Sequence, residues 1–134
     1  MMAGDWVWLP RPVIEALHDR LLADHGGPVG VRDEGLLESA LFRPRHLAAY
    51  GAPDVCDLAA AYAGGLARNH PFVDGNKRTA FMAAYVFLAR NGRRLTAPEA
   101  DATHTMMALA AGDMDESAFA VWLRHNSVAH RERG

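Results

Sequence analysis

The chain has little of several features that would assign it to a class. It holds one cysteine, Cys56, in 134 residues, which excludes an intrachain disulfide framework and fits a reducing compartment. The formal net charge is only -2, so no overall positive charge favours nucleic acid or an anionic membrane. No apolar run reaches the roughly 18 residues needed to span a bilayer, and the N-terminus does not resemble a signal peptide. We expect a cytoplasmic protein with no membrane partner and no direct nucleic-acid binding.

Linkers and internal repeats are also absent from the pattern. A chain of 134 residues is the right length for one domain that buries roughly two thirds of its unfolded surface. Half of its residues are hydrophobic and 22% are charged, which is typical of a globular protein. We therefore predict a single domain over residues 1–134, with a frayed polar tail at about 130–134.

The hydrophobic periodicity predicts an all-α domain, a compact bundle of about six helices with at most a short N-terminal strand at residues 6–9. Pro44 is expected to end the second helix, and the Gly64-Gly65 pair is expected to allow a neighbour to pack closely. The fourth helix is apolar on almost every face, which predicts a central position. The predicted helices run from Pro12 to the Gly26-Gly27-Pro28 sequence, at about 33–42, at about 55–69, at 79–91, at 98 to about 112, and at 116 to about 125.

The only lysine, Lys77, lies in the most informative segment. All thirteen other strongly basic residues are arginines, which indicates that position 77 needs the more compact cation. Lys77 belongs to the sequence His-Pro-Phe-Val-Asp-Gly-Asn-Lys-Arg at 70–78. Pro71 and Gly75 punctuate this run, so it is predicted to be a loop that leads into the N-terminus of the fourth helix.

The end of this loop predicts a phosphate site. The first backbone N–H groups of a helix have no intrahelical partner, and the helix dipole favours an anion there. Gly75 allows the backbone to form a concave nest of N–H groups, and Lys77 and Arg78 add two positive charges. Asn76 can cap the helix or orient a substrate group. A di- or triphosphate is the natural occupant.

Three further residues of the run complete a candidate reaction centre. His70 has the right ordinary pKa to accept a proton from a hydroxyl at neutral pH. Asp74 can hold Mg²⁺, which binds proteins through one or two carboxylates and takes its other ligands from substrate phosphates. Phe72 is expected to anchor the loop in the core. Together these residues favour base-assisted attack of a hydroxyl on a nucleotide phosphate.

The run resembles the signature loop of the Fic/Doc superfamily, and specifically that of its death-on-curing (Doc) toxin branch. Residues 30–41, followed by Arg43-Pro44, are similar to the N-terminal block of that branch, and residues 69–92 are similar to its core. The likeness extends from about Trp6 to Leu123. It implies a Fic/Doc-like helical bundle and a toxin of a type II toxin–antitoxin system.

Two departures from the adenylyl-transferring Fic pattern decide what the resemblance implies about chemistry. Lys77 stands where those enzymes have glycine, and Phe81 stands where they have a second arginine. The Doc branch shares both departures, which implies a protein kinase that transfers the γ-phosphate of ATP to a threonine of translation elongation factor Tu. Gly75 matches the adenylyl-transferring pattern instead, so nucleotidyl transfer stays as the alternative.

The resemblance also assigns roles by position. His70 is the general base, Asp74 is the magnesium ligand, and Asn76, Lys77 and Arg78 hold the phosphates of ATP. Many Fic enzymes are restrained by a helix with Ser/Thr-x-x-x-Glu-Gly/Asn. The only Glu-Gly pair here is Glu34-Gly35, and it lacks the Ser or Thr. Restraint is therefore expected from another chain, a small antitoxin that is partly disordered until it binds.

Two other hypotheses remain open at this point. Small helical ribonuclease toxins of the HEPN class use Arg-x₄-His, and Arg20 and His25 have this spacing. Roughly 0.7 such matches are expected by chance, so the motif is weak. The chain could also be an inactive module that only binds an antitoxin or a DNA-bound repressor, although His70, Asp74 and Lys77 are all intact.

Overall fold

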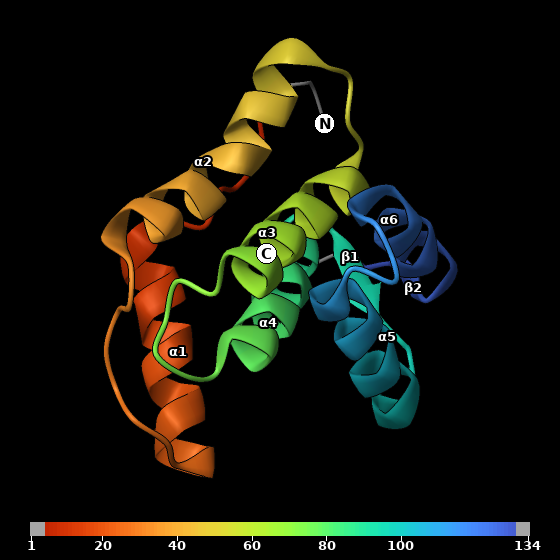
Figure 1. The fold of residues 1–134 in the computed structure, drawn as a ribbon. Coiled ribbons are helices and arrows are strands. Elements are labelled where there is room, and N and C mark those ends of the chain that lie inside the picture. Colours follow the sequence, from red (N-terminus) through yellow and green to blue (C-terminus); the bar gives the residue numbers. More distant parts are fainter. Residues whose placement is uncertain (1–4, 131–134) are drawn as a thin grey trace.

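The structure, a computed structural model, describes residues 5–130 (Figure 1). In this range the chain forms six helices and a two-stranded antiparallel sheet, so the predicted all-α class is confirmed. The helices and strands are α1 (Arg11–His25), α2 (Glu34–Tyr50), α3 (Val55–Asn69), α4 (Asn76–Arg90), β1 (Arg93–Leu95), α5 (Glu99–Ala111), α6 (Glu116–His125) and β2 (Ser127–Ala129). Over residues 5–130, no helix combines the length and hydropathy that a membrane crossing requires.

The centre of the bundle is α3, which corrects the prediction that the fourth helix lies there. Every residue from Leu58 to Ala67 is buried, because this stretch consists mainly of alanine and glycine and neighbours can approach it from all sides. The helix α4 packs beside α3 and leaves Tyr85 partly exposed. Figure 1 shows this pair between α1 and α2 on one side and α5 and α6 on the other.

The two adjacent glycines of α3 let other elements pack closely, as predicted. A Cβ atom added at Gly65 would lie 3.1 Å from both Cα and Cβ of Ala40 in α2. A Cβ atom at Gly64 would lie 2.9 Å from Oε1 of Glu116 in α6. Gly65 therefore meets a rigid backbone, whereas Gly64 meets the end of a flexible side chain.

The predicted end of the second helix at Pro44 is wrong. The helix continues through Pro44 to Tyr50, and Pro44 itself is buried. A proline inside a helix removes one hydrogen bond and crowds the preceding turn. Here Leu47 and Ala48, in the turn beyond Pro44, pack against the core, and this tertiary packing offsets the local cost.

The short N-terminal strand that the sequence allowed at residues 6–9 does not form. Side chains, in place of a neighbouring strand, bond to the backbone of this segment. The N–H of Val7 donates to Oδ1 of Asn91 (2.8 Å), and Nδ2 of Asn91 donates to the carbonyl of Val7 (3.1 Å). The N–H of Leu9 donates to the hydroxyl of Tyr62 (2.9 Å). The segment thus runs extended along the bundle.

The two-stranded sheet, which was not predicted, forms near the other end of the chain. Strands β1 and β2 pair with Arg93 opposite Ala129 and Leu95 opposite Ser127. The predicted frayed tail begins at His130, whose N–H donates to the carbonyl of Gly92 (2.9 Å). The remainder of that tail, 131–134, lies outside the described residues.

Candidate functional site

The predicted loop connects α3 to α4 and starts at a strained residue. His70 follows the last residue of α3 and has φ 49° and ψ 55°, the left-handed conformation. Within residues 5–130 it is the one residue other than glycine with a positive φ. Such a conformation costs on the order of 1–3 kcal/mol and is concentrated at functional sites. The surrounding structure must therefore hold His70 in place.

The loop is held on one side by the segment that precedes α2. The N–H groups of Arg32 and Asp33 donate to the carbonyl of Pro71 (2.7 and 3.1 Å), and the N–H of Val73 donates to the carbonyl of Gly30 (3.0 Å). These bonds form a short antiparallel bridge centred on Val31 and Phe72. The loop is therefore tied to a segment about 40 residues earlier in the chain.

Phe72 anchors the loop in the core, as predicted, and Asn76 closes the loop around it. The Phe72 side chain is 2% exposed and stacks on the ring of His18, with ring centroids 3.8 Å apart. Nδ2 of Asn76 donates to the carbonyl of Phe72 (3.0 Å), and Oδ1 of Asn76 accepts from the N–H of Phe72 (2.9 Å). Both ends of the Asn76 amide are thereby engaged within the loop.

This arrangement refines the prediction for Asn76. The residue is the first of α4, and Gly75, with φ 79°, occupies the N-cap position without a side-chain cap. The Asn76 side chain therefore holds the loop closed, and Asn76 is not the cap of the helix. Its backbone N–H has no intrahelical partner and is the group that could meet a phosphate.

His18 is a loop-supporting residue that sequence reasoning missed. It is 2% exposed, and its Nε2 lies 2.8 Å from the carbonyl oxygen of Asp74. A carbonyl only accepts, so Nε2 carries the proton and donates. The sequence did carry a signal for this role. The buried face of the first helix consists of Ile14, His18 and Leu22 at helical spacing, and a histidine on such an apolar face needs a hydrogen-bond partner.

Asp74 lies on the exposed side of the turn. Its Oδ1 accepts from the N–H of Gly75 (2.8 Å). The other oxygen, Oδ2, faces Gly27, where an added Cβ atom would lie only 2.5 Å away. Gly27 thus leaves room for the carboxylate, which stays available to a further ligand.

The predicted cations Lys77 and Arg78 are exposed in the first turn of α4. The ion pairs found among residues 5–130 involve neither of them. The first turn of α4 also contains no acidic residue. The two cations at the helix N-terminus therefore form no ion pair within the described part of the chain, and the preceding acidic residue in the sequence is Asp74, in the turn just before the helix. Such a helix N-terminus suits an anion.

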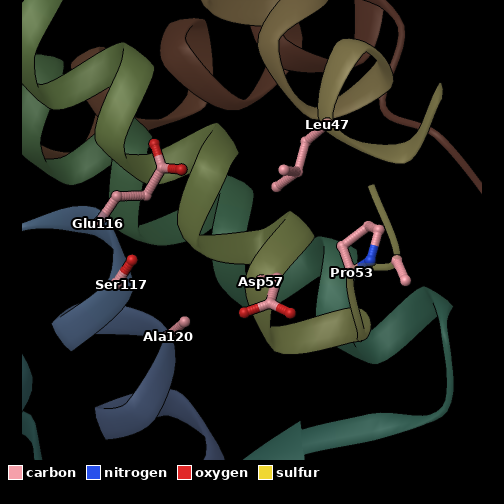
Figure 2. A pocket seen from close by; sticks show the side chains of 7 residues that line it. Leu47, Pro53, Asp57, Glu116, Ser117 and Ala120 are labelled. Atoms are coloured by element: carbon pink, nitrogen blue, oxygen red, sulfur yellow. The ribbon is translucent and has the colours of Figure 1, made fainter. Parts of the chain in front are cut away.

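A cavity of about 270 Å³ lies elsewhere, between the C-terminal part of α2, the start of α3 and α6 (Figure 2). Two carboxylates in its wall, Asp57 and Glu116, are bonded to Arg124 and Arg43 at 2.6 Å. His70 is at the opposite end of α3, roughly 20 Å from Asp57 at 1.5 Å per residue. None of the predicted site residues lines this cavity, which is formed by Leu47, Ala52, Pro53, Asp57, Glu116, Ser117 and Ala120.

Comparison with known proteins agrees with the loop and with the helices around it. The model of the Fic/DOC family matches residues 8–88, a range that contains α1 to α3, the whole loop and most of α4. The chain belongs to the Fic/DOC family. It is 38% identical over 112 residues to "Protein kinase doc" of Escherichia phage P1, an alignment covering 81% of this chain and 86% of the phage protein.

A second relative places the chain with the Doc members of the family. It is 52% identical over 75 residues to "Toxin Doc" of Mycolicibacterium smegmatis strain ATCC 700084 / mc(2)155. That alignment covers 54% of this chain and 57% of the mycobacterial protein, so it spans little more than half of that relative's length. The suspected resemblance to the Doc branch is therefore confirmed.

Family membership disfavours the ribonuclease hypothesis. Arg20 and His25 are exposed residues of α1, and Nε of Arg20 pairs with Oδ2 of Asp24 on the same helix at 3.4 Å. The match to a different family contains the loop at 70–78, which the ribonuclease hypothesis leaves without a role.

Proposed function

We propose that this protein is a toxin that transfers the γ-phosphate of ATP to a threonine hydroxyl of a translation factor such as elongation factor Tu, and so arrests translation. The supporting observation is the N-terminus of α4, where Lys77 and Arg78 are exposed beside the left-handed Gly75. A relative named as a protein kinase, similar over most of both chains, supports the same reaction class.

The chemistry follows from the residues of the loop. The phosphates of ATP bind the free N–H groups at the start of α4, and Lys77 and Arg78 balance their negative charge. His70 accepts the proton of the target hydroxyl as its oxygen bonds to the γ-phosphorus. The bond between that phosphorus and the β,γ-bridging oxygen breaks, and ADP leaves. Positioning and charge stabilisation carry most of such a transfer.

Asp74 fits a magnesium ion bound together with the nucleotide. It offers an exposed hard oxygen next to the phosphate site. Across residues 5–130 no three His, Cys, Asp or Glu residues gather in a way that could hold a metal by themselves. Magnesium characteristically completes its shell with substrate phosphates and water, so one carboxylate suits it. When bound, the ion would offset charge on the phosphates.

Lys77 and Phe81 favour phosphoryl over adenylyl transfer. Lys77 places a side chain where adenylyl-transferring relatives have none, and Phe81 packs partly buried against the core and offers no charge to the distal phosphates. Gly75, the residue that matched the adenylyl pattern, has a backbone reason of its own. It needs φ 79°, and an added Cβ atom would meet His18 only at an ordinary 3.6 Å. Nucleotidyl transfer is the second candidate function.

The proposal includes a small antitoxin as partner. The only Glu-Gly pair lacks the motif of an internal inhibitory helix, and Glu34 is bonded to Arg11 at the start of α2. Restraint would then come from a second chain. Because the proposed substrates ATP and elongation factor Tu are cytoplasmic, a cytoplasmic location is part of the same proposal.

The test uses ATP labelled with ³²P at either the γ or the α position, together with purified elongation factor Tu and Mg²⁺. We expect label from the γ position alone to reach the target, and a chelator to abolish the transfer. Intact-mass analysis of the target separates phosphoryl from adenylyl addition, which differ by hundreds of daltons. Transfer of α label would establish the nucleotidyl alternative.

The same labelled nucleotides applied to a bacterial lysate test the choice of target. Labelling of a protein other than elongation factor Tu would retain the kinase and reject the target. Co-expression of the neighbouring small open reading frame should relieve growth arrest. Its failure to do so would reject the antitoxin.

A further inference from the structure

The Arg32 side chain binds the end of α3 where His70 begins the loop. Nε of Arg32 donates to the carbonyl of His70 (2.8 Å), and Nη2 donates to the carbonyl of Asn69 (2.9 Å). The last carbonyls of a helix have no intrahelical partner. A guanidinium satisfies two of them at once and places positive charge at the negative end of the helix dipole.

The backbone of Arg32 extends this contact by one residue. Its N–H donates to the carbonyl of Pro71 (2.7 Å). Arg32 therefore bonds three successive carbonyls, at positions 69, 70 and 71. The side chain of Asn69 supports the same joint, since its Nδ2 donates to the carbonyl of Leu36 (3.1 Å). The segment before α2 thus grips both peptide groups that flank His70.

These hydrogen bonds hold His70, the residue with the left-handed backbone conformation. The φ and ψ angles of His70 set the direction of its Cα–Cβ bond, and so decide where the imidazole can reach. Left-handed backbone is unfavourable for a residue with a Cβ atom, so a free chain would relax to another conformation. Two charge-assisted bonds to the adjoining carbonyls oppose that relaxation.

We propose that Arg32 is a positioning residue, which holds the backbone of His70 in the left-handed conformation and thereby directs its imidazole at the target hydroxyl. The inference rests on the proposed role of His70 as general base. Arg32 bonds protein carbonyls and not the phosphates, so it acts on the step in which the proton is transferred. The two bonds leave from different nitrogens of a planar fork, a geometry that lysine cannot reproduce.

The experiment compares Arg32→Ala, Arg32→Lys and the control Arg43→Ala, which removes an exposed arginine whose two side-chain hydrogen bonds go to Glu116 and not to the loop. Phosphate transfer from [γ-³²P]ATP is measured with elongation factor Tu, or with the proteins labelled in a lysate if that factor is not the target. We expect Arg32→Ala to lower kcat by about 10- to 100-fold while KM for ATP stays within about twofold. Arg32→Lys should fall in between, and Arg43→Ala should retain kcat.

A second measurement does not depend on catalysis. The imidazole signals of ¹³C-labelled histidine are recorded by NMR, and the His70 signal is assigned by its loss in His70→Ala. In Arg32→Ala this signal should shift or broaden into several, while the other imidazole signals and the melting temperature stay close to those of the parent. In Arg43→Ala the His70 signal should stay in place.

The outcomes separate this inference from the proposed function. If His70→Ala abolishes transfer but Arg32→Ala retains kcat and leaves the His70 signal unmoved, the positioning role is wrong and the proposed function stands. A rise in KM alone would also reject it, because it would make Arg32 a nucleotide ligand. If His70→Ala retains full transfer, the proposed function itself fails, whatever Arg32 does.

Discussion

Along α3 one arginine of α2 and one of α6 are paired with carboxylates, whereas beyond its C-terminal end Lys77 and Arg78, in the first turn of α4, have no such partner among the residues that the structure describes. Arg124 bonds Asp54 and Asp57, both at 2.6 Å, and Arg43 bonds Glu116 at 2.6 Å. Lys77 and Arg78 stay exposed beside the N–H groups of α4. Charges that form ion pairs within the chain stabilise the fold, and charges without an ion-pair partner are available to a ligand.

The backbone differs between the two ends in the same way. Asp54 and Asp57 form a capping box, in which each side chain accepts the N–H of the other residue, at 2.8 and 2.9 Å. This is a favourable helix start. The other end of α3 stops at His70 in a strained conformation. A strained backbone and charges without an ion-pair partner therefore occur together near the loop, and neither occurs at the capped N-terminal end of α3.

The comparison is tested most strongly by His70→Ala. Removing the proposed base should lower phosphate transfer by about 10²- to 10⁴-fold. Because His70 is exposed, the free energy of unfolding should change little. Transfer of γ label and growth arrest measure the first effect, and urea unfolding measures the second. The control is His25→Ala on α1. If that variant loses activity while His70→Ala keeps it, the reaction centre is not at the loop.

Asn76→Ala should affect both stability and function, since it removes the side chain that holds the loop closed. The N–H and C=O of the buried Phe72 lose their partners, which should lower the free energy of unfolding by about 2–3 kcal/mol. Chemical denaturation measures this loss, and hydrogen exchange at the N–H of Phe72 should locate it. Unchanged stability would mean that the loop is held without the Asn76 amide.

The two adjacent glycines of α3 pack against different kinds of neighbour, rigid backbone at Gly65 and a flexible side chain at Gly64. Alanine gains about 1 kcal/mol over glycine from helix propensity at either position. At Gly65 the new methyl group meets the backbone of α2, and overpacking costs about 1–3 kcal/mol. At Gly64 it displaces only the end of Glu116. Gly65→Ala should therefore be less stable than Gly64→Ala by about 1–2 kcal/mol, as measured by urea unfolding. Equal stabilities would contradict this packing.

The smallest effect concerns the paired charges and depends on pH. Burial raises the pKa of the Asp54 carboxyl, but hydrogen bonds from Arg124 and from the Asp57 backbone outweigh burial and hold this pKa below its ordinary value of 3.8. Because the folded pKa is the lower one, this stabilisation is present above the unfolded pKa and is lost as the pH falls through the folded pKa.

Arg124→Ala should accordingly be slightly less stable than the parent at pH 7, by up to about 1 kcal/mol for so exposed a pair. The difference should shrink as the pH is lowered below 3.8. Lys77→Ala, which removes a cation without an ion-pair partner, should leave the free energy of unfolding unchanged both at pH 7 and at low pH. Melting curves between pH 7 and pH 3 measure both. A pH-independent loss in Arg124→Ala would show that its packing, and not its charge, stabilises the fold.

Several elements could be predicted from residue patterns alone. The bounds of the helices at 55–69 and 116–125 agree with the structure to the residue, because Asp54 and Asp115 cap them and apolar residues follow at helical spacing. The loop after Asn69 was recognisable because proline, glycine and a change of periodicity coincide there, but it was predicted three residues too long, since α4 begins at Asn76 and not at Thr79. The second helix was cut short at Pro44, since the packing of Leu47 and Ala48 beyond the proline leaves no local signal.

The sequence by itself determined the family, the helical class and the identity of the loop residues, because each of these depends on which residues stand at a fixed spacing along the chain. Tertiary structure alone decided that His18 supports Asp74, that Arg32 grips His70 and that α3 lies at the centre. These contacts join residues about 40 to 60 positions apart. Local propensity does not encode such pairs, and only the packed fold brings them within hydrogen-bonding distance.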